Sequence, residues 1–465
     1  MALYPHLLRS LTAFAVSVIA ATPLHGLAQN ASVAAADAAP YFRIVDGATA
    51  INSGNTAWML TATALILLMT IPGLALFYAG MVRKKNMLDT MAHSFVTTCL
   101  VTVLWVTMGY SLAFTSGSAF IGGLDRMFLQ GMIYVHGTGQ VSVHALAPTV
   151  PESVFMMFQM TFAIITPALI TGAFAERIKF SVLIWFTVLW SLLVYAPVAH
   201  WVWSADGWLA TRGVLDFAGG TVVHINAGVS GLVAAIIVGP RLGFRQISME
   251  PHNLSLTIMG ASLLWVGWFG FNGGSAGAAN GHAGMAILTT QLATATAALS
   301  WMLIEWTRRG RPSVLGLVSG AVSGMVAITP AAGFVGVEGA MTIGAVSGIA
   351  CFFAATSLKA MFHYDDSLDV FGVHAVGGIV GALLTGVFAV KSIGGVEGNI
   401  LTQAMGVLVT VAYAGGVTAV ILLTLKMLVG LRVSPAEEEI GLDNIEHGEQ
   451  LPESSGVASP SHSAG

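Results

Sequence analysis

Two histidines stand alone inside long apolar segments of the sequence. His224 lies in GGTVVHINAGVSG (219–231), and His374 lies in DVFGVHAVGGIVG (369–381). A neutral imidazole both donates and accepts hydrogen bonds, and it titrates at about pH 6.5. Two of them in an apolar passage could guide a small neutral amine or relay a proton. The alternative is a pair of core histidines that are hydrogen-bonded to neighbouring backbone.

A second group of residues could hold a cation. In WVGWFGFNGGSAG (265–277), Phe271 and Ser275 are four positions apart, so they share one face of a helix. Phe162 and Trp203 are predicted near the same membrane face, at the ends of two other apolar segments. Aromatic rings and one hydroxyl oxygen can hold a small cation that has lost part of its hydration shell. The alternative is an ordinary belt of aromatic residues at the membrane interface, which we favour for the two tryptophans of this run.

The elements that position these residues are membrane helices. Of the 465 residues, 55% are hydrophobic and only 9% are charged, and the mean hydropathy is +0.81. A soluble domain has about 25% charged residues. The composition therefore predicts an all-α integral membrane protein, embedded in a lipid bilayer. The net charge of -4 and the lack of a basic patch give no reason to expect a nucleic-acid partner.

The sequence predicts neither an enzyme nor a metal site. Cys99 and Cys351 both lie in apolar runs and lack metal-ligand spacing. The chain has no HExxH motif, which disfavours an intramembrane metalloenzyme that uses paired His and Asp. We therefore expect no catalytic residue and no cofactor.

The N-terminal segment 1–28 has the pattern of a signal peptide. Arg9 precedes a run of apolar residues, and small residues ending in GLA follow. The run is short for a membrane span of about 20 residues, although a retained anchor helix is the alternative. We expect cleavage near Ala28, followed by a polar extracytoplasmic tail over 29–56.

Eleven segments are long and apolar enough to cross a membrane. Each has about 20 residues, the length that crosses roughly 30 Å at about 1.5 Å per residue. Among the loops, only 115–151 is long, and it shows no clear periodicity. The spans form one domain over 57–428, followed by a tail over 429–465. We predict them at 57–80, 91–114, 152–173, 180–203, 218–239, 254–274, 283–306, 313–330, 335–358, 370–390 and 400–428.

The distribution of positive charge predicts the orientation. Of the 18 lysine and arginine residues, those on the same side as the mature N-terminus are Arg43, Arg126, Arg212 and Lys391. Positive residues gather on the cytoplasmic side of membrane proteins. The sequence therefore predicts an outer N-terminus and a cytoplasmic C-terminus.

The two histidine segments also form an internal repeat. Glycine recurs four and seven residues after each histidine, at Gly228, Gly231, Gly378 and Gly381. An acidic residue precedes each histidine, which we assign as Asp216 and Asp369. Because the histidines fall in spans five and ten, the two five-span units enter the membrane in opposite directions. This predicts an inverted 5+5 repeat with its binding site near the midplane, plus one C-terminal helix outside the repeat.

The chain resembles the ammonium transporters of the Amt/Mep/Rh family, in particular the bacterial Amt branch. The resemblance covers about 52–448. It rests on DFAGGTVVHINAG (216–228), GWFGFNGGSAG (267–277), PHN (251–253), TPAAGFVG (329–336), DVFGVHAVGG (369–378) and MTIPGLALFYAG (69–80).

The resemblance implies a homotrimer in a bacterial inner membrane. Each subunit would have eleven helices and one pore. It implies that Phe162, Trp203 and Ser275 form an outer site that recruits ammonium, with Thr329 nearby. Phe162 and Phe271 would be a stacked gate below that site.

The same resemblance assigns the interior of the pore. His224 and His374 would line it, and Asp216 would support the outer site electrostatically without touching the ion. The residues alone allow Asp216 to be a helix cap, which is compatible with that role. The resulting prediction is a transporter that binds NH4+ outside, removes its proton and conducts NH3. Whether the proton follows by a separate route is left open.

The tail VGLRVSPAEEEIGLDNIEHGE (429–449) also resembles that of the family, which couples subunits and docks a PII-type signal protein. From its charges alone we would expect a solvated acidic tail. The alternative function is an ammonium sensor that signals through this tail to a PII-type protein.

Overall fold

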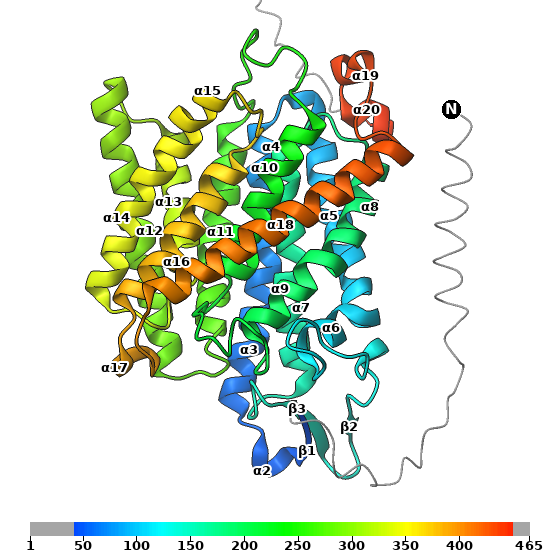
Figure 1. Ribbon diagram of the computed structural model, residues 1–465, viewed down its shortest axis with the longest axis vertical. Helices are drawn as coiled ribbons and strands as arrows, with labels where there is room; N and C mark the ends of the chain where they lie inside the picture. The colour runs from blue at the N-terminus through cyan, green and yellow to red at the C-terminus, as the bar shows by residue number, and fades with distance from the viewer. Residues whose placement is uncertain (1–40, 450–465) are drawn as a thin grey trace, which may run out of the picture. The chain divides into compact units, whose positions relative to one another are not determined.

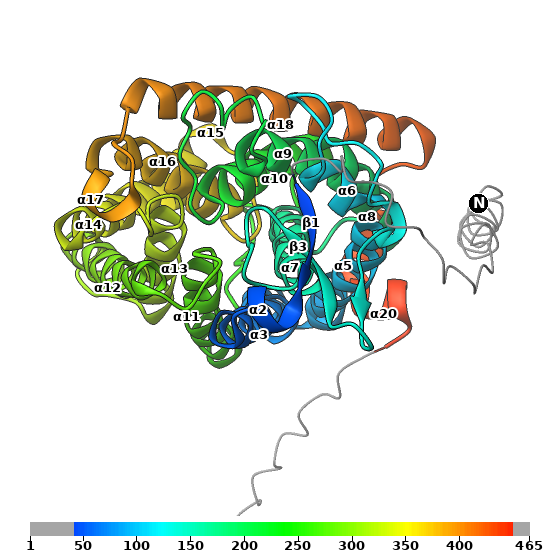
Figure 2. The ribbon, with the colours of Figure 1, turned by 90° about the horizontal axis from the view of Figure 1, so that it is seen from below.

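The computed structural model describes residues 41–449. The predicted signal peptide over 1–28, the first part of the predicted outer tail and the residues after 449 lie outside the described residues. Within the described range the chain is mostly helical, and the long helices run side by side in one bundle (Figures 1 and 2). The predicted all-α membrane class is confirmed.

Ten helical stretches of the described part are long and apolar enough to cross a membrane. An eleventh apolar helix, α13 (Val314–Ile328), has 15 residues and coincides with the predicted span 313–330. Each predicted span therefore corresponds to a helix. The ten long stretches are Ser53–Met81, Lys84–Phe114, Glu152–Ala173, Phe180–Trp203, Gly220–Val238, Leu254–Gly274, Gly281–Arg309, Val337–Phe362, Phe371–Phe388 and Ile400–Leu428.

Several of these stretches contain one wide π-helical turn. Such turns shift the register of a helix and are frequent at functional sites. Two of them hold the histidines: η7 (Gly220–Ile225) carries His224, and η9 (Phe371–Ala375) carries His374. The others are η1 (Met69–Leu74), η3 (Trp105–Gly109), η6 (Ser191–Tyr195) and η8 (Ala354–Leu358).

The repeated glycines allow the two halves to cross closely. The turn η7 continues as α10 (Asn226–Val238), and η9 continues as α16 (Val376–Phe388). A Cβ atom on Gly228 of α10 would lie 2.2 Å from the backbone nitrogen of Ala375, beside His374. A Cβ atom on Gly378 of α16 would lie 2.9 Å from a side-chain carbon of Ile225, beside His224. Each glycine thus makes room for the histidine turn of the other half, which supports the predicted repeat.

The last long helix, α18 (Ile400–Leu428), runs obliquely along the outside of the bundle, against α10 and α16 (Figures 1 and 2). The tail helices α19 (Pro435–Ile440) and α20 (Leu442–His447) follow it at one end of the bundle (Figure 1). This placement agrees with an eleventh span that is added outside the repeat.

A small antiparallel sheet lies at the opposite end of the bundle from α19 and α20 (Figure 1). Its order is β1-β3-β2, formed by β1 (Phe42–Asp46), β2 (Tyr134–Val135) and β3 (Gln140–His144). Phe42 is opposite His144, and Asp46 is opposite Gln140. The long 115–151 loop and the segment before the first span therefore fold together, which the sequence did not indicate because each strand is too short to show an alternating pattern.

Candidate functional site

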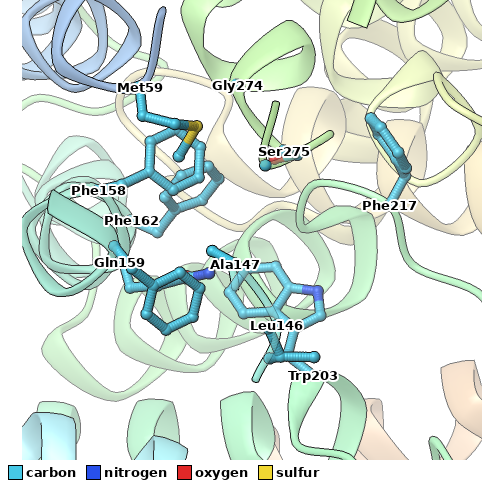
Figure 3. A pocket seen from close by; sticks show the side chains of 12 residues that line it. Met59, Leu146, Ala147, Phe158, Gln159, Phe162, Trp203, Phe217, Gly274 and Ser275 are labelled. Carbon is cyan, nitrogen blue, oxygen red and sulfur yellow. The ribbon is translucent and has the colours of Figure 1, made fainter. Parts of the chain in front are cut away.

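A cavity of about 180 Å³ lies close to the sheet, where the ends of several long helices meet. Figure 3 shows its side chains, which come from segments that are far apart in the sequence. Its wall is largely aromatic. The lining residues are Met59, Leu146, Ala147, Phe155, Phe158, Gln159, Phe162, Trp203, Phe217, Gly274, Ser275 and Gly277.

The structure brings three of the predicted outer-site residues together in this wall. Phe162, on α7 (Glu152–Ile170), and Trp203, at the end of α9 (Ala196–Trp203), meet edge to face with ring centroids 5.7 Å apart. Trp203 is held by its indole N–H, which donates to the carbonyl of Asp216 at 2.9 Å. Ser275 follows α11 (Leu254–Gly274), and its hydroxyl donates to the carbonyl of Phe271 at 2.9 Å. The serine oxygen keeps its acceptor capacity for a ligand.

The cavity ends at two buried phenylalanines. The ring of Phe162 lies against that of Phe271, with centroids 4.3 Å apart and an angle of 42° between the planes. Both are at most 1% exposed. Phe271 is not among the lining residues, so it lies behind Phe162 as seen from the cavity. The predicted pair is therefore in place, as tilted rather than parallel rings.

Behind Phe271 the two histidines face each other. Their Nδ1 atoms are 3.3 Å apart, and their rings lie 5.4 Å apart at an angle of 14°. Both are buried, and the Nε2 atom of His224 has no hydrogen-bond partner among the described residues. One imidazole must donate and the other accept across this contact. The alternative of a core histidine that bonds to backbone does not describe His224.

Asp216 fixes the start of the turn that carries His224. One carboxylate oxygen accepts from the N–H groups of Gly219 and Gly220, at 2.9 and 2.6 Å. The other accepts from Thr221 and Val222, at 2.9 and 3.0 Å. A carboxylate has about four acceptor positions, so these bonds occupy them all. Asp216 is thus a cap of this turn, and backbone N–H groups occupy both of its carboxylate oxygens.

The counterpart of Asp216 in the second half is Asp366, and our assignment of Asp369 is wrong. Asp366 precedes His374 by the same distance in sequence as Asp216 precedes His224, and its carboxylate accepts from the N–H of Phe371 at 2.8 Å. Burial raises the pKa of Asp366 to about 6. Asp369 instead forms an ion pair with Lys359 at 2.7 Å.

Two residues, Trp268 of α11 and Thr329 at the end of α13, lie elsewhere than the sequence suggested. Trp268, which we assigned to an interfacial belt, is 2% exposed and stacks on His224 with centroids 5.4 Å apart. Its indole N–H donates to the hydroxyl of Thr329 at 2.9 Å. Thr329 is buried and does not line the cavity. The structure therefore connects Thr329 to the histidines through Trp268, and not directly to the outer site.

Gln159 is a cavity residue that our sequence analysis missed. Its amide oxygen is buried and has no hydrogen-bond partner in the described part of the chain. It stands three positions before Phe162 on α7, so both residues face the cavity (Figure 3). An amide in an otherwise apolar helix, one turn from the predicted Phe162, was the available signal.

The tail packs against the chain, so the expectation of a solvated acidic segment is wrong. Glu438 is fully buried: its carboxylate accepts from Arg432 and from the N–H of Leu242, both at 2.6 Å. Arg83 lies 3.8 Å away, and Lys85 donates to the Glu438 carbonyl at 2.9 Å. These basic side chains and N–H donors compensate for the burial of the charge.

The last tail helix docks on the start of α5 (Met87–Leu104). The Asp443 carboxylate accepts from the N–H of Asp89 at 2.8 Å, and His447 Nε2 lies 3.1 Å from an Asp89 oxygen. The other Asp89 oxygen lies 3.3 Å from the ring of His93. One buried carboxylate thus links the tail to the membrane helix.

Comparisons with known proteins agree with one another. The family model described as Ammonium Transporter Family matches residues 57–451. An ammonium transporter of Aquifex aeolicus (strain VF5) is 51% identical over 407 residues, which are 86% of this chain and 93% of the relative. The crystal structure of Saccharomyces cerevisiae Mep2 matches with a TM-score of 0.75 at 36% identity, over 84% of this chain and 92% of that one. A structure described as a sensor Amt protein matches with a TM-score of 0.77 at 31% identity, over 85% and 98%.

Proposed function

The chain belongs to the ammonium transporter family and is an ammonium transporter, and from this premise we propose a path for its substrate. NH4+ is recruited in the outer cavity by Phe162, Trp203 and Ser275. The ion loses its proton at Phe162 and Phe271, the two phenylalanines at which the cavity ends. It then crosses as NH3 between His224 and His374.

One observation carries this proposal, namely an unbroken series of ring contacts from the cavity to the histidines. The centroid separations are 5.7 Å from Trp203 to Phe162, 4.3 Å to Phe271, 6.0 Å to His224 and 5.4 Å to His374. The series supports a narrow apolar route that opens only where Phe162 and Phe271 separate.

The upper part of the route suits a cation. The faces of Phe162 and Trp203 attract positive charge, and the oxygens of Ser275 and Gln159 can accept from ammonium N–H groups. The negative charge of Asp216 attracts the cation electrostatically, although backbone N–H groups occupy the carboxylate oxygens. Thr329 acts indirectly. Its hydroxyl accepts a hydrogen bond from Trp268 and so holds the indole ring against His224.

The lower part suits a neutral molecule. Neither histidine has a carboxylate partner among the described residues, and burying an unpaired charge in apolar surroundings is costly. Ammonia instead can donate to one imidazole nitrogen and accept from another. The proton removed from NH4+ either returns outside or follows separately.

We place the cavity on the outer side and the tail in the cytoplasm of a bacterial inner membrane. The chain is a multi-pass membrane protein, and eleven crossings follow if α13 spans the bilayer with the ten longer helices. The positive-inside distribution and the position of the tail opposite the sheet support this orientation. Removal of the 1–28 signal peptide, assembly as a homotrimer and docking of a PII-type protein on the tail belong to the same proposal.

A second candidate function is ammonium sensing through the tail. Two observations favour it: the match to a structure described as a sensor Amt protein, and the buried contacts of Glu438 and Asp443 with the body of the protein. A tail docked in this way can report a change in the helices to a PII-type protein.

The test is the current from proteoliposomes after a jump in ammonium concentration, with sodium as the ionic control. We expect an ammonium-specific current or, for electroneutral conduction, ammonia-driven swelling of the vesicles. The double variant His224→Ala with His374→Ala should lose the proton-coupled signal. His136→Ala, in the exposed outer loop, is the matched control and should behave as wild type.

Different outcomes separate the two candidates. Neither current nor swelling from folded wild-type protein, together with ammonium-dependent recruitment of a PII-type protein, would replace transport by sensing. Unchanged ammonium flux and selectivity in the double variant would rule out the histidine path.

A further inference from the structure

A second cavity lies next to the outer cavity, and nothing in the proposed path uses it. It measures about 240 Å³ and is lined by Tyr41, Ser116, Ala145, Leu146, Ala205 and Asp206. Leu146 lines both cavities.

Two short segments connect the walls of the two cavities. Ala145 and Ala147 lie on either side of Leu146, one in each wall. Trp203 of the outer cavity is the last residue of α9, and Asp206 of the second cavity lies in the turn that follows it. The second cavity therefore adjoins the outer cavity.

The fold holds the side chains of this second cavity in place. The carbonyl of Tyr41 accepts from the N–H of Ala145 at 2.8 Å, which extends the pairing of β1 with β3. The Tyr41 side chain is buried, and its hydroxyl donates to the Oδ1 atom of Asp206. The hydroxyl of Ser204 donates to the same oxygen at 2.9 Å. The carboxylate is thus oriented through one oxygen.

The other oxygen of Asp206 is available. No described residue donates a hydrogen bond to Oδ2, and no arginine or lysine of residues 41–449 lies within 4.0 Å of the carboxylate. The nearest basic group is His200, whose Nε2 atom is 3.7 Å from Oδ1. The Asp206 side chain is 42% exposed. A fixed, partly exposed carboxylate without an arginine or lysine beside it attracts small cations.

We infer that this second cavity is an outer cation site, which takes ammonium before it reaches Trp203 and Phe162. The inference rests on the proposed function of the outer cavity. Ammonium donates four hydrogen bonds, and two residues of the wall, Asp206 and Ser116, carry side-chain oxygens that accept hydrogen bonds. Because the site is partly open, it binds weakly and raises the local ammonium concentration at the neighbouring cavity.

The test compares half-saturating ammonium concentrations of the proteoliposome current at low and high ionic strength. We expect Asp206→Asn to raise this concentration about two- to threefold at roughly 10 mM salt, and to have little effect near 1 M salt, where the Debye length is only about 3 Å. Asp206→Glu should keep most of the wild-type affinity. Glu338→Gln removes an exposed charge on the outer side, away from both cavities, and should leave the concentration unchanged.

The variant Tyr41→Phe separates a cation site from a merely structural bond. It removes the hydrogen bond to Asp206 but keeps the carboxylate, so we expect a smaller shift than in Asp206→Asn. Equal shifts in the two variants, or a shift that does not shrink with salt, would overturn the inference. A wild-type protein without any saturable ammonium current would instead count against the proposed function, so the two failures are distinguishable.

Discussion

His224 and His374 point their Nδ1 atoms at each other across 3.3 Å, although 150 positions separate them in the chain. Each histidine occupies a π-helical turn at the start of its helix, and each turn rests on a glycine of the other half. The contact is therefore a product of how the two halves cross.

The crossing depends on Gly228. In Gly228→Ala the new Cβ would lie 2.2 Å from the backbone nitrogen of Ala375, and backbone cannot move aside as a flexible side chain can. We expect a loss of about 1–3 kcal/mol in the free energy of unfolding, seen as a lower melting temperature in detergent, and a loss of transport. Gly416→Ala on α18 meets no atom within 4 Å and is the matched control. Equal melting temperatures for the two variants would contradict this packing.

The ring pair of Phe162 and Phe271 should set the selectivity for ammonium over sodium. Phe162→Ala removes the ring that closes the cavity above Phe271. A cation–π contact contributes roughly 1 kcal/mol, so we expect the ratio of ammonium to sodium current to fall by about tenfold or less, through a larger sodium current than in wild type. Phe95→Ala, on the exposed face of α5, is the control and should keep the wild-type ratio. If Phe162→Ala carried no more sodium current than wild type and kept the wild-type ratio, the gate would lie elsewhere.

Asp216 should act through the backbone. Asp216→Ala leaves the N–H groups of Gly219, Gly220, Thr221 and Val222 without their acceptor. Each buried donor that is left unpaired costs about 1–3 kcal/mol, so we expect a lower melting temperature and loss of transport. Asp216→Asn keeps one oxygen acceptor and should fall between wild type and Asp216→Ala in thermal unfolding. A fully stable Asp216→Ala variant would argue that the carboxylate is not a cap.

Docking of the tail should weaken as the cytoplasmic pH rises. The hydrogen bond to Asp89 raises the pKa of His447, and the nearby charges of Glu446 and Asp443 act in the same direction. A group whose pKa is raised by folding stabilises the folded form fully below its unfolded pKa, about 6.5 for histidine, and loses this contribution as the pH rises through the raised value. The docked tail is therefore favoured on the acid side of this window.

A spin label at the exposed Asn444 would report this release, in a background with Cys99 and Cys351 replaced by alanine. We expect the mobile fraction of its spectrum to grow as the pH rises from about 6.5 through the raised pKa of His447. His447→Gln should show little change over the same range, and a wild-type spectrum independent of pH would contradict the role of His447.

Much of the fold follows from the sequence, because a membrane helix is specified by its length and its lack of charge. The eleven predicted spans correspond to helices for this reason. The π-helical turns at His224 and His374 were not predictable, since a wide turn leaves no mark in hydropathy. The sheet was missed for a different reason: β1 finds its partner β3 far along the chain, and five residues show too little alternation to reveal it.

The site was predictable where a motif carried it and less so where packing decided it. Phe162, Trp203 and Ser275 meet at one cavity as the resemblance implied. Trp268 was misplaced because an interfacial tryptophan and a buried one look alike in sequence. Asp369 does precede His374, but the cap requires the spacing that Asp366 has.

The pairing of β1 with β3 also gives the chain an order of assembly. Strand β1 precedes the first membrane helix, while β3 follows the second, so the sheet can form only after both helices have been inserted and the loop between them and the third has emerged. Once formed, it ties the start of the first helix to the loop that leads into the third. Tyr41 precedes β1 and Leu146 follows β3, and both line the second cavity, so the wall of this cavity is complete only when the two strands are paired.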